Sequence, residues 1–208
     1  MHELQLAVNL TGWRIFTRRK EDKAFLPVAK RVLQRDAYTC QYCAFQAQEY
    51  QEVVNLDGNY LNNKPSNLIT ACCFCAQCLF IQAVGVDEMS GGQLIYLPEV
   101  SQADLNSFCH VLFCALGNNT SYQDSAQSIY RSLKFRSQII ENKFGAGTSN
   151  PSVLGQMMIE YQVHEPERKI DILEDMRLLP SYVKFSVQLD AWAAAALREL
   201  EEEAQAQG

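Results

Sequence analysis

The second half of the chain places apolar residues every three or four positions, which is the spacing of one face of an α-helix. This pattern begins after Ser101, where Ser101 and Asp104 have the spacing of an N-terminal capping box, and it ends at Gly117. The same periodicity predicts further helices over residues 121–144, 153–162, 170–176 and 186–203. The pattern therefore predicts a mainly α-helical second half.

The first half has shorter apolar runs. Residues 4–9 and 13–17 are β-prone, which predicts a hairpin or an extended N-terminal arm. Pro27 begins a short helical pattern, because proline suits the first turn of a helix. Residues 53–56 predict a strand, and Gly58 in the segment after it predicts a turn. Short strands and one helix are therefore expected before the helical half.

Composition and charge limit the classes of protein that fit. The chain has 208 residues, of which 48% are hydrophobic, so it can build a folded core. Its 18 Lys and Arg against 24 Asp and Glu give a net charge of −6, which argues against a protein that coats nucleic acid. We expect a module over residues 1–92 and a helical region over residues 93–208, packed as one continuous unit, with residues 93–99 at the boundary.

The cysteines point to an intracellular, metal-binding chain. The first nine residues lack the pattern of a secretory signal. The segment between Lys64 and Asp87 has no charged residue, but its amides and four cysteines do not suit a membrane span, so no membrane insertion is expected. Clustered cysteines in an intracellular protein bind metal more often than they form disulfides.

Two C-x2-C pairs carry the clearest chemical signal. Cys40 and Cys43 form the first pair, and Cys72 and Cys75 form the second, with 28 residues between the pairs. Four thiolates in two such knuckles can converge tetrahedrally on one structural Zn²⁺ ion. Cys75 and Cys78 have the same spacing, so the spacing alone leaves open whether Cys78 replaces Cys72 or Cys75.

Residues 33–43 read L-x-R-D-x-Y-x-C-x2-C and residues 67–75 read N-L-x3-C-x2-C, and this combination resembles the zinc-stapled HNH endonuclease family. The resemblance covers residues 28–86 and favours Cys72 and Cys75 over Cys78 as ligands. It implies an α+β fold, in which a zinc-stapled, ββα-metal-like module with short antiparallel strands precedes the helical half.

The histidines that this family uses for catalysis are missing. Asn55 stands where the family's general base would be, and an asparagine side chain cannot accept a proton at neutral pH. Ala76 follows the last cysteine in place of a histidine, and the central asparagine is retained as Asn67, for which we expect bonds to backbone within its loop. We therefore expect no catalytic residues and no enzyme activity.

Other candidate residues have less specific interpretations. His110 falls in a predicted helix, where a structural role is favoured over metal ligation, and His2 and His164 are expected to be solvated. The basic run at residues 18–20 is followed by Glu21 and Asp22, which predicts a solvated loop. The remaining cysteines outside the knuckles are expected in the core: Cys73, Cys109 and Cys114.

Across its length, the chain is also similar to the zinc-containing adaptors of the Dot/Icm type IVB secretion coupling complex. That resemblance implies a non-catalytic protein that binds the C-terminal extension of a DotL-like coupling ATPase and other adaptors of the complex, supports effector export, and contacts no nucleic acid. It implies a cytoplasmic location at the bacterial inner membrane, held there by the partner. The alternatives are an HNH-type nuclease, active or vestigial, and a zinc-dependent nucleic-acid-binding protein.

Overall fold

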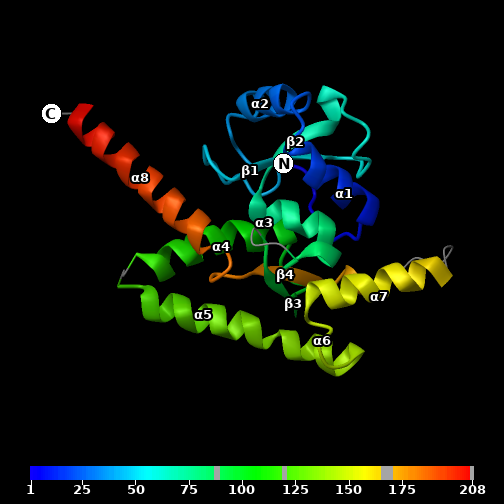
Figure 1. Ribbon diagram of the computed structural model, residues 1–208. Coiled ribbons are helices and arrows are strands. Elements are labelled where there is room, and N and C mark those ends of the chain that lie inside the picture. Colours follow the sequence, from blue (N-terminus) through cyan, green and yellow to red (C-terminus); the bar gives the residue numbers. More distant parts are fainter. Residues whose placement is uncertain (87–89, 119–120, 165–170, 207–208) are drawn as a thin grey trace.

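The computed structural model describes residues 1–86, 90–118, 121–164 and 171–206 (Figure 1). With η for a 3₁₀ turn, the elements in chain order are α1 (Leu10–Arg19), α2 (Leu26–Arg35), β1 (Gln51–Asn55), η1 (Pro65–Asn67), β2 (Leu68–Cys72), α3 (Cys73–Ala76), η2 (Gln77–Ala83), β3 (Gly92–Tyr96), α4 (Gln102–Gly117), α5 (Gln123–Phe135), α6 (Ser137–Phe144), α7 (Pro151–His164), η3 (Asp171–Leu173), β4 (Met176–Pro180) and α8 (Ser186–Ala206). The fold is mixed α+β, as the sequence predicts.

Strands β1 and β2 form a two-stranded antiparallel sheet. Gln51 pairs with Cys72 at one end and Asn55 pairs with Leu68 at the other. The connection between the strands turns at Gly58, whose φ of +68° is a backbone conformation that favours glycine. The predicted strand and turn are confirmed. Helices α1, α2 and α3 surround this sheet to form the upper part of the molecule in Figure 1.

Of the hairpin or extended arm that we expected at the N-terminus, the hairpin does not form, because residues 10–19 are helix α1, and only residues 1–9 precede it without helix or strand. Asn9 begins the helix by accepting a hydrogen bond from the Gly12 N–H at 2.8 Å, an N-cap that overrides local β propensity. The helix then buries Phe16, which stacks on Phe80 with ring centroids 5.0 Å apart. This tertiary contact decides the helical form of a β-prone sequence.

A second antiparallel sheet, which the sequence analysis missed, lies in the helical half. Strand β3 pairs with β4, with Gly92 opposite Pro180 and Tyr96 opposite Met176. The helix expected over residues 170–176 is reduced to the turn η3, and residue 170 lies outside the described residues. Because the pairing joins segments about 80 residues apart in the sequence, local periodicity could not predict it.

The other helices follow the prediction closely. Ser101 caps α4 by accepting from the Asp104 N–H at 3.1 Å, and α2, α7 and α8 lie where the sequence placed them. The long helix expected over residues 121–144 is divided into α5 and α6 at Arg136. The Arg136 carbonyl accepts a hydrogen bond from the Tyr96 N–H, so the break places α6 against the end of strand β3.

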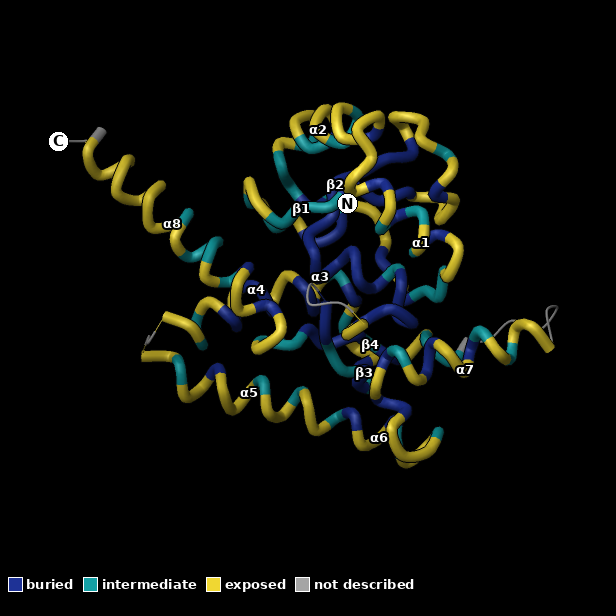
Figure 2. Tube along the Cα trace, in the orientation of Figure 1, coloured by how far each residue is buried: buried dark blue, intermediate teal, exposed yellow. Residues whose placement is uncertain are grey.

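Buried residues from both halves of the chain form a continuous core (Figure 2). Leu4, Phe74 and Ile81 from the first half pack in the same cluster as Leu178 and Phe185 from the second. Helix α8 leaves this body, and its C-terminal part is exposed in Figure 2. In the described part of the chain, no helix has both the length and the apolar character needed to cross a membrane.

Candidate metal centre

The first knuckle is a tight backbone turn that presents two thiols on one side. The Cys40 N–H donates to the Phe45 carbonyl at 2.8 Å, and the Ala44 N–H donates to the Cys40 carbonyl at 3.0 Å. Ala44 closes the turn with φ of +63°, a left-handed conformation that costs a non-glycine residue about 1 kcal/mol or more. This turn brings the Cys40 and Cys43 side chains together.

The second knuckle lies at the junction of strand β2 and helix α3. Cys72 is the last residue of β2, and Cys75 lies in the single turn of α3. The Gln41 N–H donates to the Thr70 carbonyl at 2.9 Å, and Asp36 accepts from the Thr70 N–H at 2.9 Å. These bonds join the segment of the first knuckle to β2, so the two knuckles face each other.

The four sulfur atoms of Cys40, Cys43, Cys72 and Cys75 all lie within 4.8 Å of one another, and the Cys43 and Cys72 sulfurs are 3.6 Å apart. Tetrahedral ligation at about 2.3 Å per bond places sulfur atoms about 3.8 Å apart, so the donor set fits a Zn²⁺ ion. All four residues are buried, with at most 6% of their surface exposed. Cys78 lies outside this group and donates to the Phe74 carbonyl at 3.2 Å.

Electrostatics of the cluster favour a bound cation. Burial raises the pKa of Cys72 and Cys75 well above that of an ordinary thiol. Hydrogen bonds from the Cys43, Cys72 and Cys75 thiols lower the pKa of Cys40, so Cys40 is the cysteine of the cluster that ionises while its neighbours stay protonated. Because zinc binds thiolates, a divalent ion would supply the charge that lets all four cysteines ionise.

Helix α4 supplies two polar side chains beside the cluster, a feature that the sequence analysis did not identify. His110 lies with Nε2 3.4 Å from the Cys72 sulfur, and Asn106 Nδ2 donates to the Cys75 sulfur at 3.3 Å. Burial lowers the pKa of His110 to about 3, so its imidazole is neutral. The available signal in the sequence was the recurrence of polar residues at every fourth position of the predicted helix, at Gln102, Asn106 and His110.

At position 55, the HNH endonucleases that the sequence resembles have a histidine, and this chain has an asparagine with a structural role. Asn55 is buried, and its side-chain oxygen accepts from Arg19 at 2.6 Å, while its amide donates to the carbonyls of Asn59 and Asn62. The solvated loop predicted for residues 18–20 is therefore wrong for Arg19, which is 6% exposed and also donates to the Val53 carbonyl. A buried guanidinium contacts the site where a nuclease would hold its base.

Other residues singled out in the sequence lie as follows. Asn67 donates to the Asn62 carbonyl at 2.9 Å and accepts from the Asp57 N–H at 3.1 Å, which confirms its expected loop-closing role. Ala76 is buried beside the knuckle. The predicted burial of the other cysteines is confirmed for Cys73 and Cys109 and is wrong for Cys114, which is exposed on α4. His2 and His164 are exposed, as predicted.

The fold and the site together define a mixed α/β protein with a cluster of four cysteines that could bind a metal ion. Two of the cysteines come from each knuckle, and helix α4 lies beside the cluster. No protein-family model matches the chain. The type 4 apparatus protein DotN of Legionella pneumophila subsp. pneumophila (strain Philadelphia 1) is 56% identical over 198 residues, which are 95% of this chain and 92% of that protein. The chain therefore belongs to the DotN family.

Proposed function

We propose that this protein is a zinc-binding, non-catalytic adaptor of a type IVB secretion coupling complex. The observation that carries the proposal is the 56% identity to a type 4 apparatus protein across nearly the whole of both chains. In this proposal, the protein binds a DotL-like coupling ATPase and other adaptors, works at the cytoplasmic face of the bacterial inner membrane, and supports export of effector proteins.

The metal in this proposal is one structural Zn²⁺ ion held by Cys40, Cys43, Cys72 and Cys75. The compact set of four buried sulfurs supports this ligand assignment. An all-cysteine tetrahedral site leaves no open position for water or substrate, so the ion would stabilise the fold without acting on a substrate. Asn55 and Ala76, in place of histidines, and the charge of Arg19 beside Asn55 support a module without nuclease chemistry.

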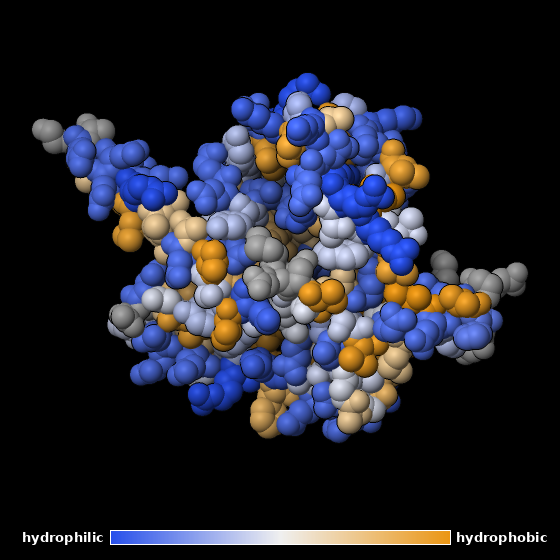
Figure 3. Space-filling view, in the orientation of Figure 1, coloured by the Kyte–Doolittle hydropathy of each residue, from blue (hydrophilic) through white to orange (hydrophobic). Residues whose placement is uncertain are grey.

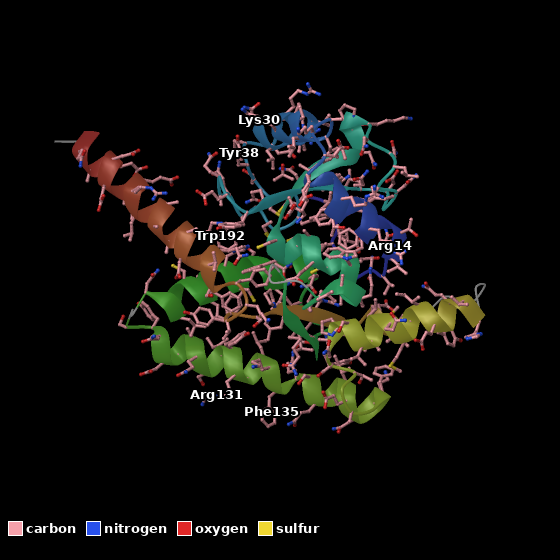
Figure 4. The ribbon with its side chains drawn as sticks, viewed as in Figure 1. Arg14, Lys30, Tyr38, Arg131, Phe135 and Trp192 are labelled. Carbon is pink, nitrogen blue, oxygen red and sulfur yellow. The ribbon has the colours of Figure 1, made fainter. Side chains whose placement is uncertain are left out.

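An adaptor needs exposed surfaces that partners can cover, and the projecting helices have them. Apolar residues gather over α7 in Figure 3, where Met157 and Val163 are exposed. Phe135 lies on the outer side of α5 in Figure 4 and is 67% exposed, and Leu197 and Leu200 are exposed on α8. Contiguous exposed apolar surface, such as that over α7, is typical of protein-binding surfaces, which supports a scaffold role.

We also propose that residues 1–92 and 93–208 fold as one continuous unit. The core shared by both halves supports this proposal, as do the contacts of α4 with the knuckles.

Affinity capture tests the adaptor proposal. The tagged protein is recovered from detergent-solubilised membranes of its native host, and co-purifying proteins are identified by mass spectrometry. We expect stoichiometric recovery of a membrane-anchored coupling ATPase. Recovery of nucleic acid, or of no protein partner, would contradict the adaptor proposal.

Cysteine variants test the ligand assignment. Cys40→Ser and Cys72→Ser each remove one thiolate, so we expect the purified variants to lose zinc and stability. Cys114→Ser is the matched control, because Cys114 is exposed and lies outside the cluster. Metal content is measured by elemental analysis, and one equivalent of zinc retained in both ligand variants would overturn the assignment.

A further inference from the structure

Helix α4 carries a row of buried polar side chains that ends at the cysteine cluster. Gln102, Asn106 and His110 follow one another at four-residue intervals, and their exposed fractions are 2%, 0% and 8%. Residues at this spacing lie above one another on one helix face. Burying amide and imidazole groups costs free energy unless each is hydrogen-bonded, so their partners indicate their role.

The partners of the first two residues fix the orientation of the Asn106 amide. Gln102 accepts from the Leu178 N–H at 2.7 Å and donates to the Leu178 carbonyl at 2.9 Å, which joins α4 to strand β4. Gln102 also donates to the Asn106 side-chain oxygen at 2.9 Å. Because this oxygen is already engaged, the NH₂ group of Asn106 faces Cys75, with its nitrogen 3.3 Å from the sulfur.

The His110 ring is held by aromatic residues from both knuckles. Phe45 stacks on one side with a centroid distance of 3.6 Å, and Phe74 stacks with a centroid distance of 4.3 Å. His110 Nε2 lies 3.4 Å from the Cys72 sulfur, whereas the buried Nδ1 has no hydrogen-bond partner among the described residues. A proton on Nδ1 would be an unsatisfied donor, so the neutral imidazole carries its proton on Nε2 and points it at Cys72.

Both donors favour the metal-bound form of the cluster over the metal-free form. Four thiolates around one divalent ion leave a net charge of −2 in a buried site, whereas the metal-free cluster carries less negative charge. An N–H group stabilises a thiolate more than a thiol, because hydrogen bonds to a charged acceptor are the stronger ones. Side chains that orient or polarise metal ligands in this way alter metal affinity without touching the ion.

We propose that His110 and Asn106 are positioning residues of the metal centre. The His110 N–H donates to Cys72 and the Asn106 N–H donates to Cys75. Metal binding and the packing of α4 against the knuckles are therefore coupled. This inference rests on the proposed function, because it requires that the four cysteines hold a metal ion. The coupling extends to α8, since Trp192 contacts the His110 ring edge-on at a centroid distance of 5.2 Å.

The test uses variants that remove a donor and keep the shape of the side chain. His110→Phe retains a ring to stack between Phe45 and Phe74, and Asn106→Asp is nearly isosteric but turns an acceptor toward Cys75. Val111→Ala is the matched control on the same helix, because Val111 is 69% exposed. Each full-length protein is titrated with zinc against a chromophoric chelator, and its Co²⁺-substituted form is examined by absorption spectroscopy.

We expect about 10- to 100-fold weaker zinc binding in His110→Phe and Asn106→Asp, with a shifted sulfur-to-cobalt charge-transfer band. The stability of the metal-free protein, measured by urea unfolding, should change less than that of the zinc-bound protein. Wild-type zinc affinity in both variants, or equal destabilisation of both forms, would overturn this inference alone. A wild-type protein that binds neither Zn²⁺ nor Co²⁺ would overturn the proposed metal centre as well.

Discussion

At the scale of single residues, the buried Arg19 gives Asn55 a structural role at the position where the HNH endonucleases that the sequence resembles have a histidine. Its guanidinium bonds Asn55 and lies over the rings of Phe25 and Tyr60, at 4.4 and 4.7 Å from their centroids. Burial lowers the pKa of Arg19 to about 10, so the group remains charged at neutral pH. Asn55 therefore serves as an uncharged acceptor for a buried cation.

A histidine at position 55, as in the HNH endonucleases that the sequence resembles, should not give this protein nuclease activity. In Asn55→His, an imidazole with one donor and one acceptor cannot reproduce the three hydrogen bonds that the Asn55 amide makes to Arg19 and to the carbonyls of Asn59 and Asn62. The larger ring also overpacks the site, and together these effects should lower the free energy of unfolding by at least about 2 kcal/mol. Urea unfolding measures this loss, and a DNA cleavage assay with Mg²⁺ or Mn²⁺ should detect no activity.

Asn63→His is the control for that experiment, because Asn63 is exposed in the same loop. It should keep the stability of the wild type within about 0.5 kcal/mol. Cleavage of DNA by Asn55→His would show that the module retains the rest of a nuclease site, and would contradict the purely structural role of position 55.

At the scale of secondary-structure elements, close packing of α7 on the η2 turn positions the helical half. Gly155 makes this approach possible, because a Cβ atom there would lie 2.6 Å from the Gln82 Cα and 2.7 Å from the Gln82 nitrogen. Those atoms are backbone and cannot move aside as a flexible side chain would. The small size of Gly155 is therefore needed for α7 to pack closely on η2, and its backbone freedom is not needed for a turn.

Gly155→Ala tests this contact against helix propensity. In the interior of an exposed helix, alanine is more stable than glycine by about 1 kcal/mol, so helix propensity alone predicts that Gly155→Ala stabilises the protein. We expect the opposite sign, with a net loss of about 1–3 kcal/mol in the free energy of unfolding, because α7 must move away from η2. Gln156→Ala, at an exposed position of α7, is the control for helix propensity. An increase in stability for Gly155→Ala would contradict this packing.

At the scale of the whole molecule, the cysteine cluster lies where the two halves of the chain meet. His110 and Asn106 reach it from α4, and Trp192 reaches the stacked rings of Phe45 and Phe74 from α8. The Trp192 indole N–H also donates to the Glu49 carbonyl at 3.1 Å, at the base of the projecting α8 helix (Figure 4). We therefore expect a metal ion held by the four cysteines to influence the stability of both halves.

Removal of the metal with a strong chelator tests this expectation. Zinc bound only to the native state adds its binding free energy to folding, so chelation should lower the unfolding temperature by more than about 10 °C. In Trp13→Phe, Trp192 is the single tryptophan, and its fluorescence should change at the same temperature as the far-ultraviolet circular dichroism of the helices. A separate helical transition that chelation does not shift would contradict the single-unit proposal.

The two cysteine pairs and most helices of the second half could be predicted because each depends on local spacing. Cys40, Cys43, Cys72 and Cys75 are recognisable as two pairs, and apolar periodicity locates α4, α7 and α8. Zinc ligation and helix amphipathicity impose short, regular intervals on a chain, and such intervals can be read without knowledge of the fold.

Only the tertiary structure decided which distant residues meet. Residues 10–19 become helical through packing on Phe80, β3 finds its partner about 80 residues later, and Arg19 is drawn from a charged run into the core. His110 and Asn106 reach the cluster across 38 and 31 residues of chain. Contacts of this kind depend on how elements pack and leave no periodic signal in the sequence, so the surroundings of the metal centre had to come from the fold.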